Sequence, residues 1–337
     1  MKLDRNIYEV SVVIPTYNVS KYIESTLESV IMQTIDDFEI VIVDDGSTDN
    51  TVELCKKTLE TVNIPYKILR QSNSGVSVAR NRGIDASEGK YIYLLDSDDL
   101  INKFFLEKMI YTAKKNNADI VFCGFDKIDE QQNLIEQYSS LYSYIEGELT
   151  GIEVLKLMLK EQIWICTISG IYKRELICNN NITYTPKCSN GEDQEFCMKN
   201  LIHAKNITCV KESLAFYVQR DSSVSYSGSL KKFNALGATR RVINYAEKES
   251  DDKNIVQYLK YNKYQKEFFR NFNSLLKYSP NSEVIKVINR NKKFINQLKK
   301  YKSIEKSKKE MKFSIRYRIY VYAPNLYTCI LKKIYNR

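Results

Sequence analysis

A hydrophobic segment that runs directly into three carboxylates constrains the fold of this chain most. Residues 91–95, Tyr-Ile-Tyr-Leu-Leu, are typical of a strand buried on both faces, as in the centre of a parallel sheet. Asp96, Asp98 and Asp99 follow at once. Neighbouring carboxylates repel one another unless a cation compensates them, and their oxygens suit Mg²⁺ or Mn²⁺. Ligands of open α/β sheets bind beyond the carboxyl ends of strands, so this segment predicts an accessible divalent-metal site.

Three other interpretations of these acids exist. In an EF-hand loop that starts at Asp96, Ile101 would stand where the sharp turn needs glycine. A phosphatase-type nucleophilic Asp-x-Asp is expected on the first strand, whereas these acids follow a later one. The third alternative is a solvated acidic turn without a function.

The chain is long enough to bury a large hydrophobic core. Its 337 residues suffice for one large domain, or for a domain with an extension. No apolar run approaches the roughly 18 to 20 residues that span a bilayer, and the charged start lacks the apolar region of a signal peptide. The eight cysteines form no Cys-x-x-Cys pair, so we expect free thiols in a reducing compartment and a cytoplasmic protein.

The net charge of +10 is concentrated at one end of the chain. Residues 298–337 contain twelve Lys or Arg and only two acids, so this tail carries the whole excess and the remaining body is neutral. A basic tail on a neutral body argues against a basic groove across the fold. We therefore expect no nucleic-acid partner.

Strand and helix patterns alternate through the first part of the chain. Strand patterns occupy residues 9–15, 38–43, 65–69, 91–95 and 119–125. Helical patterns separate them, one of them starting with Asp49 as its cap. This order predicts an α/β fold with a doubly wound, mainly parallel sheet flanked by helices. Because the second strand also ends in acids, Asp44 and Asp45, we expect two acidic strand ends to meet in one crevice.

The alternation weakens after residue 126. Residues 126–151 are polar without a clear pattern, 163–172 are apolar, and helical patterns cover 152–160 and 190–203. Residues 206–218 predict a strand pair or one long strand. From Leu230 onward the chain is helical and rich in lysine.

The acidic strand ends indicate a nucleotide diphosphate as ligand. One end can hydrogen-bond a base or ribose, and the other can hold a metal that bridges a diphosphate. Neither a P-loop nor Gly-x-Gly-x-x-Gly follows any predicted strand. Metal, in place of glycine-rich backbone, would then bind the phosphates.

Five motifs in order resemble the signatures of family 2 glycosyltransferases, which have the GT-A fold. The match spans roughly Val10 to Ser225, and the motifs are Pro15-Thr16-Tyr17-Asn18, Asp44-Asp45-Gly46-Ser47, Asn73-Ser74-Gly75 with Ala79-Arg80-Asn81-Arg82-Gly83, Asp96-Ser97-Asp98-Asp99, and Gly191-Glu192-Asp193. The resemblance implies an inverting transferase that moves a sugar from a nucleotide diphosphate, most often UDP, to a hydroxyl acceptor. It also implies Mn²⁺ or Mg²⁺ as cofactor.

The resemblance assigns roles to individual residues. Asp98 would be the principal metal ligand with Asp96 beside it, and Asp193 would be the general base. The acidic Glu192-Asp193 pair could instead be the first turn of a helix, stabilised by its dipole. Arg80 would lie near the diphosphate or form a structural salt bridge. The predicted donor-site residues are Pro15, Thr16, Tyr17, Asn18, Asp44, Asp45, Asn73, Gly75, Arg80, Asp96 and Ser97, and Glu192, Trp164 and Arg220 are assigned to the acceptor side or to other roles.

The resemblance also divides the chain. Residues 1–125 would form the nucleotide-sugar-binding half of a GT-A domain, 126–228 the half with the acceptor site and the base, and 229–337 a helical basic extension. Gln219-Arg220 is only loosely similar to the Gln-x-x-Arg-Trp of processive members, which favours transfer of a single sugar. The expected acceptor is a glycan or lipid-linked oligosaccharide of a bacterial capsule, lipopolysaccharide or other surface polysaccharide.

The tail has two interpretations. Residues 313–335 are amphipathic, basic and rich in tyrosine, which suits the headgroup region of an anionic membrane and predicts peripheral association with its cytoplasmic face. Alternatively, they form a helical cap packed on the catalytic body. Pro324 should split any helix there.

Two other functional classes could use a sheet of this kind. A nucleotidyltransferase that makes sugar nucleotides should carry a glycine-rich basic loop after the first strand, where this chain has Pro15-Thr16-Tyr17-Asn18. A non-catalytic glycan-binding or scaffold protein on the same fold is expected to lose its carboxylates. Asp98 and Asp193 are both present.

Overall fold

A computed structural model of the chain describes residues 7–188, 190–220, 233–278, 296, 298–302 and 308–335. It contains two compact units: Met1–Cys188 with Glu192–Arg220, and Ser189–Gly191 with Asp221–Arg337. The predicted boundary between residues 228 and 229 lies outside the described residues. The division at residue 125 stays a prediction.

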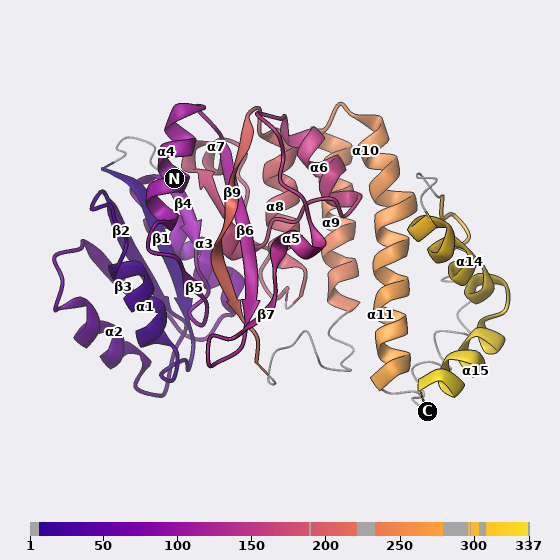
Figure 1. Cartoon of the computed structure of the whole chain (residues 1–337), viewed down its shortest axis with the longest axis horizontal. Coiled ribbons are helices and arrows are strands. Elements are labelled where there is room, and N and C mark those ends of the chain that lie inside the picture. Colours follow the sequence, from indigo (N-terminus) through magenta and orange to yellow (C-terminus); the bar gives the residue numbers. More distant parts are fainter. Residues whose placement is uncertain are drawn as a thin grey trace. The chain divides into compact units, whose positions relative to one another are not determined.

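Four parallel strands form the first half of the sheet in the first unit (Figure 1). They are β1 (Tyr8–Thr16), β2 (Phe38–Asp44), β3 (Tyr66–Arg70) and β4 (Gly89–Leu94), in the order β3-β2-β1-β4. β2 is buried along its whole length, and β1 and β4 nearly so, because their aliphatic and aromatic residues face helices on both sides. The predicted α/β fold with its parallel strands is confirmed.

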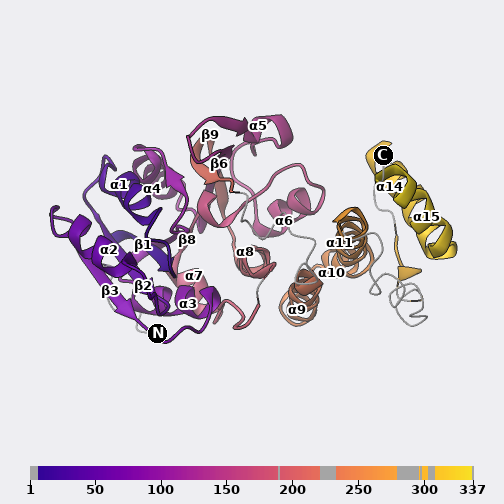
Figure 2. The ribbon, with the colours of Figure 1, turned by 90° about the horizontal axis from the view of Figure 1, so that it is seen from below.

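Helices cover both faces of this half of the sheet. They are α1 (Ile23–Ile31), α2 (Thr51–Leu59), α3 (Val76–Ala86) and α4 (Phe105–Lys115). Figure 2 shows α1 and α4 on one face and α3 on the other. The prediction of Asp49 as the cap of α2 is wrong, because Asn50 is the N-cap residue. Asp49 instead accepts hydrogen bonds from the backbone N–H of Thr51 at 3.1 Å and from its hydroxyl at 2.6 Å.

Gly83 explains how closely α3 approaches the sheet. A Cβ atom at this position would lie 2.3 Å from Cγ1 of Val13 on β1 and 3.3 Å from Cγ2 of Val43 on β2. Only glycine therefore allows the observed packing. The same packing fixes the position of Arg80, which lies one turn earlier on α3.

The second half of the sheet is mixed. Its strands are β5 (Leu100–Ile101), β6 (Ile120–Ile128), β7 (Leu134–Glu136), β8 (Gly170–Lys173) and β9 (Ile207–Val218). The order continues from β4 as β8-β6-β9-β5, with β7 paired to β6. β8 is antiparallel to both β4 and β6, which the apolar run at 163–172 did not predict. The segment predicted as a strand pair or one long strand forms the single long strand β9, and its register against β6 shifts at Gly124.

Short helices connect these strands. They are α5 (Tyr138–Leu141), α6 (Gly151–Leu159), the 3₁₀ helix η1 (Thr167–Ser169), α7 (Arg174–Asn179) and α8 (Glu192–His203). Thr150 caps α6 in a reciprocal capping box with Glu153. α8 begins at Glu192, so the acidic pair Glu192-Asp193 occupies its first turn.

The second unit is helical and has an aromatic core. Its helices are α9 (Asn234–Glu249), α10 (Lys253–Tyr258), the π-helix η4 (Leu259–Lys263), α11 (Tyr264–Tyr278), α14 (Lys308–Tyr322) and α15 (Pro324–Tyr335). Phe268, Phe269 and Phe272 of α11 contact Tyr320 of α14, with ring centroids 4.5 to 6.4 Å apart. The predicted helical C-terminal extension is confirmed.

The structure changes the interpretation of the tyrosines in the tail. Tyr317, Tyr320 and Tyr327 are at most 5 % exposed, because they pack into the aromatic core of the second unit. These three tyrosines are therefore part of the core, whereas Tyr322 is 74 % exposed. Pro324 separates α14 from α15, as predicted. Among the described helices, none is long and apolar enough to cross a membrane.

Candidate active site

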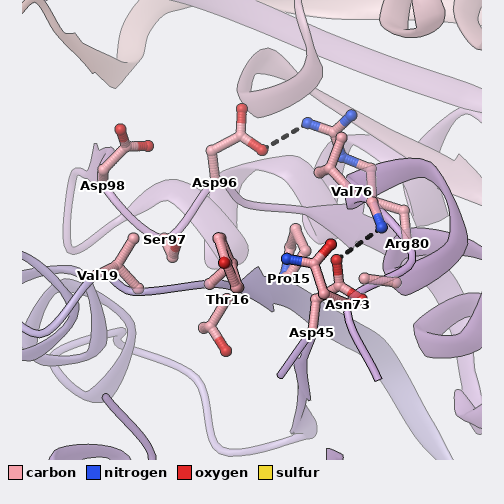
Figure 3. Close-up of a pocket in the computed structure, with 13 residues that line it drawn as sticks. Pro15, Thr16, Val19, Asp45, Asn73, Val76, Arg80, Asp96, Ser97 and Asp98 are labelled. Carbon is pink, nitrogen blue, oxygen red and sulfur yellow. Dashed lines mark hydrogen bonds and ion pairs between the residues drawn. The ribbon is translucent and has the colours of Figure 1, made fainter. Parts of the chain in front are cut away.

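A cavity of about 440 Å³ lies beyond the carboxyl ends of β1, β2 and β4 (Figure 3). This is where ligands bind in open α/β sheets. The residues that line it are Pro15, Thr16, Tyr17, Val19, Asp45, Asn73, Gly75, Val76, Ala79, Arg80, Asp96, Ser97 and Asp98. The two acidic strand ends thus meet in one crevice. Among the predicted donor-site residues, Asn18 and Asp44 are the two that do not line it.

Asp45 holds one wall of the cavity. Its carboxylate accepts hydrogen bonds from the backbone N–H groups of Ser74 at 2.8 Å and Gly75 at 2.7 Å, and from the Gln71 side chain at 2.8 Å. Gly75 has a φ of +93°, a conformation that glycine adopts without strain. The motif Asn73-Ser74-Gly75 is therefore a loop that Asp45 fixes against the end of β2.

Asp44 and Asn18 are not among the residues that line the cavity. The fully buried carboxylate of Asp44 accepts hydrogen bonds from Nε of Arg70 at 3.1 Å and the N–H of Ser47 at 3.2 Å. Oδ1 of Asn18 accepts one from the N–H of Thr48 at 2.8 Å. Both residues order the loops around the site, and their direct contact with a nucleotide stays a prediction.

Arg80 is the centre of the charged network. Its guanidinium donates to Oδ1 of Asp96 and to Oδ1 of Asp193, each at 2.7 Å, and lies 3.5 Å from Oε1 of Glu192. The side chain is 4 % exposed and lies against the ring of Tyr184, 5.1 Å from its centroid. Burial disfavours the charged guanidinium and so lowers its pKa. The charges of Asp193 and Asp96 outweigh this effect and raise the pKa of Arg80 well above its usual range. The salt bridge that the sequence left as an alternative is present, and it lies at the cavity.

The two carboxylates at the start of α8 have raised pKa values. Burial, followed by the charge of Asp193, raises the pKa of Glu192 to about 7. Burial likewise raises the pKa of Asp193, where Arg80 opposes the shift and Asp96 adds to it. The Asp193 side chain still keeps 36 % of its surface exposed. An accessible carboxylate whose pKa is raised can accept a proton as a general base.

Asp98 is tied to the end of β9. Arg220 donates to the Asp98 carboxylate, and its other terminal nitrogen donates to the Asp98 backbone carbonyl at 2.7 Å. The Arg220 guanidinium stacks on the ring of Tyr22, 3.5 Å from its centroid. Asp99 accepts a hydrogen bond from the N–H of Val218 at 2.8 Å. Sequence reasoning missed Tyr22, because nothing local marks an aromatic ring as the partner of a distant arginine.

The donor atoms present fit a divalent ion that is shared with a ligand. Asp96 and Asp98 both line the cavity and offer hard oxygen ligands. Burial and the nearby Asp96 raise the pKa of Asp98, and Arg220 opposes this shift, so added positive charge would stabilise the ionised form. Within the described ranges, no three His, Cys, Asp or Glu side chains form a metal cluster. The pair suits Mg²⁺ or Mn²⁺ bound by one or two carboxylates together with substrate phosphates.

Trp164 belongs to an aromatic cluster in the second half of the sheet. Its ring stacks on Tyr142, with centroids 6.3 Å apart, and Tyr142 contacts Tyr138. Trp164 does not line the cavity of Figure 3. Its predicted role on the acceptor side stays a prediction.

Comparison with known proteins identifies a family for part of the chain. Residues 11–176 match the model of "Glycosyl transferase family 2". The chain carries a family 2 glycosyltransferase domain. Over 222 residues it is 33 % identical to the "Uncharacterized glycosyltransferase YibD" of Escherichia coli (strain K12), covering 64 % of this chain and 63 % of that protein. Over 214 residues it is 27 % identical to the "Poly(ribitol-phosphate) beta-N-acetylglucosaminyltransferase TarP" of Staphylococcus aureus (strain N315), covering 62 % of each. The chain thus spans somewhat less than two thirds of the length of these relatives.

Solved structures show that the family 2 domain has the expected fold. The crystal structure of S. aureus TarS 1–349 in complex with UDP-GlcNAc matches with a TM-score of 0.69 at 20 % identity, covering 97 % of this chain and 91 % of that one. The mannosyltransferase PcManGT from Pyrobaculum calidifontis, in complex with GDP-Man and Mn²⁺, matches with a TM-score of 0.55 at 14 % identity, covering 97 % and 86 %. The predicted GT-A fold is confirmed.

Proposed function

We propose that this protein is an inverting glycosyltransferase that moves a single sugar from a UDP-sugar to a hydroxyl group of a glycan or glycolipid acceptor. The observation that carries the proposal is the array Asp96–Arg80–Asp193, which links the cavity beyond the parallel strands to the first turn of α8. TarS, a neighbour in fold, was solved with UDP-GlcNAc, and this supports a UDP-sugar as the donor. TarP and TarS are named poly(ribitol-phosphate) beta-N-acetylglucosaminyltransferases, which supports a polymer as the acceptor.

The two predicted halves of the GT-A domain have different roles in this proposal. Residues 1–125 bind the donor, since Thr16, Asp45 and Asp96 line one cavity. Residues 126–228 supply the base and the acceptor side. The buried hydroxyl of Thr16 has no hydrogen-bond partner among the described residues, and Thr16 is one of the residues that line the cavity.

Asp193 removes the proton of the acceptor hydroxyl in the proposed reaction. The acceptor oxygen then forms a bond to C1 of the sugar from the face opposite the diphosphate, while the bond from C1 to the diphosphate oxygen breaks and UDP leaves. Arg80 orients the Asp193 carboxylate through the 2.7 Å hydrogen bond and opposes the rise of its pKa. An α-linked donor therefore yields a β-linked product.

Asp98 and Asp96 would hold Mn²⁺ or Mg²⁺ at the donor side of the cavity. When bound, such an ion supplies positive charge that stabilises the departing diphosphate. Arg220 compensates the charge of Asp98 in this structure, so its guanidinium is available to the same region once the carboxylate has another partner.

The tail offers an exposed aliphatic stripe to an anionic membrane. Between 39 and 74 % of the surface is exposed at Met311, Ile315, Ile319, Tyr322, Leu326, Ile330 and Ile334. Their spacing of three or four residues places them along one side of α14 and α15. Exposed cations, among them Lys312, Arg316 and Lys333, lie beside the stripe. We propose that this stripe holds the enzyme at the cytoplasmic face of the membrane, near a lipid-linked acceptor. A nucleic-acid partner is not part of the proposal.

The stereochemistry of the product tests the proposed reaction. The purified protein is incubated with UDP-sugars and phosphate-bearing or lipid-linked glycan acceptors, and the anomeric configuration of the new linkage is determined by NMR. A β-linkage formed from an α-linked donor is expected. Retention of the α-configuration would show that the assigned mechanism is wrong.

A further inference from the structure

A second cavity, of about 370 Å³, lies within the C-terminal unit. α9 contributes Arg240 and Glu247, the π-helix η4 contributes Lys260 and Tyr261, and Lys300 also lines the cavity. This cavity is of a size that holds a small ligand. Neither the family 2 domain nor the proposed reaction gives it a task.

The charge of the cavity favours an anion. Lys260 forms an ion pair with Glu247. In the part of the chain that the structure describes, no carboxylate pairs with Arg240 or Lys300, so two of the three cations have no compensating acid. The Arg240 guanidinium donates a hydrogen bond to the hydroxyl of Tyr264 at 3.0 Å. Because Tyr264 is only 6 % exposed, this bond holds the guanidinium in place at the cavity wall.

The backbone around the cavity is specialised. η4 interrupts the helix that runs from α10 to α11 with a π-turn, an irregular conformation that is rare and often found at functional sites. Lys260 and Tyr261 both belong to it. The carbonyl of Tyr261 accepts a hydrogen bond from the N–H of Lys302 at 2.9 Å. This bond fixes the segment that carries Lys300 against the π-turn.

We propose that this cavity binds a phosphate group carried by a polyol or sugar, as found in a phosphate-containing acceptor polymer. An arginine and a lysine without acidic partners suit the phosphate oxygens, and the rings and hydroxyls of Tyr261 and Tyr264 suit the attached polyol. The binding of phosphate stands by itself, whereas its assignment to the acceptor rests on the proposed function. In that assignment the C-terminal unit recognises a repeat of the polymer by its charge.

Binding of sn-glycerol 3-phosphate to the whole protein tests the site. Titration calorimetry compares the wild type with Arg240→Gln/Lys300→Gln and with the matched control Lys248→Gln/Lys253→Gln, which removes the same charge from exposed positions outside the cavity. We expect affinity at least about ten-fold weaker in the cavity variant, an unchanged control, and no binding of glycerol. Equal affinities in the two variants, or no binding by the wild type, would overturn the site. Thermal unfolding of both variants checks that they fold alike.

Two further measurements are needed. One distinguishes a lipid headgroup from a soluble phosphate as the ligand, and the other distinguishes failure of this site from failure of the proposed function. Sedimentation with phosphatidylglycerol vesicles should not distinguish the cavity variant from its control. A vesicle effect of Arg240→Gln/Lys300→Gln without an effect on the soluble phosphate would overturn the acceptor assignment. UDP-sugar hydrolysis should be equal in the two variants, whereas transfer to a polyol-phosphate acceptor should fall in the cavity variant alone. Phosphate binding in a protein without any transferase activity would leave the site standing and refute the proposed function.

Discussion

Arg80 donates a 2.7 Å hydrogen bond to Asp193, a residue 113 positions later in the chain. The same guanidinium donates a second bond, also of 2.7 Å, to Asp96. One side chain therefore joins α3, the acidic end of β4 and the first turn of α8. The proposed base and the proposed donor cavity are held together by this single buried cation.

Loss of the Arg80 guanidinium should destabilise the fold. In Arg80→Gln two carboxylates lose the partner that compensates their charge, and breaking such a buried network costs about 3 kcal/mol of the free energy of unfolding. Because Asp96 and Asp193 keep about a third of their surface exposed, the lower end of the usual range is expected. Urea unfolding measures the change. The control Lys108→Gln breaks an exposed ion pair with Glu212 and should cost less than about 1 kcal/mol; equal costs would contradict the account.

Replacement of the proposed base should affect turnover far more than donor binding. Asp193→Asn keeps the shape of the side chain and removes its ability to accept a proton, so kcat should fall by about 10²- to 10⁴-fold. The Kd for the UDP-sugar should change little. Glu192→Gln serves as the control, and its kcat should fall by less than about ten-fold. A larger loss in Glu192→Gln than in Asp193→Asn would assign the base to Glu192 instead.

The pair Glu192–Asp193 should govern the acid side of the pH profile. Since the pKa of Glu192 is raised to about 7 and that of Asp193 is raised as well, kcat/KM should increase with pH up to neutrality. Glu192→Gln removes a neighbouring negative charge, which lowers the pKa of Asp193 and moves this limb to lower pH. An unmoved limb would show that the two groups do not interact.

The raised pKa of Glu192 also makes the free energy of unfolding depend on pH. Between the ordinary glutamate pKa of 4.5 and about 7, the folded protein holds the Glu192 proton whereas the unfolded chain has lost it. The free energy of unfolding therefore falls as pH rises through this window. Urea unfolding at several pH values should show this decrease for the wild type and a weaker one for Glu192→Gln. Identical pH dependence in the two proteins would contradict the raised pKa.

The aliphatic stripe of the tail should be required for vesicle binding. Ile315→Glu/Ile319→Glu places negative charge on the stripe and should abolish sedimentation with phosphatidylglycerol vesicles at low salt. The control Leu134→Glu/Ile135→Glu changes two equally exposed residues of β7 and should bind as the wild type does. Binding of the stripe variant at the wild-type level would refute membrane attachment through this surface.

The first half of the fold follows from the sequence because its signals are local. Strands buried on both faces, such as residues 91–95, have unbroken hydrophobic patterns, and a strand end followed by acids marks the ligand-binding edge. β8 escaped prediction because Gly170–Lys173 is a short strand inside a longer apolar run, and nothing in that run indicates antiparallel pairing with both β4 and β6.

In the candidate site, too, the features with a local sequence signal were predictable, whereas the contacts between distant residues were not. The sequence indicated that carboxylates gather at the strand ends, but it did not say which of two adjacent acids faces the cavity. Asp45 lines it, whereas Asp44 is buried against Arg70. Ion pairs between distant residues, such as Arg220 with Asp98, leave no local signal because any exposed arginine could be the partner. Such pairings become visible only once the chain is folded.

Release of UDP from a panel of UDP-sugars, UDP-GlcNAc among them, tests the central claim most directly. It is measured with Mn²⁺, with Mg²⁺ and with a chelator, for the wild type, Asp98→Ala and the control Asp251→Ala, an exposed acid of the second unit. Release from at least one donor should depend on the metal, disappear in Asp98→Ala and persist in Asp251→Ala. If the wild type releases UDP equally with the chelator, or if Asp98→Ala is as active as Asp251→Ala, a metal-assisted transferase centred on Asp98 is contradicted.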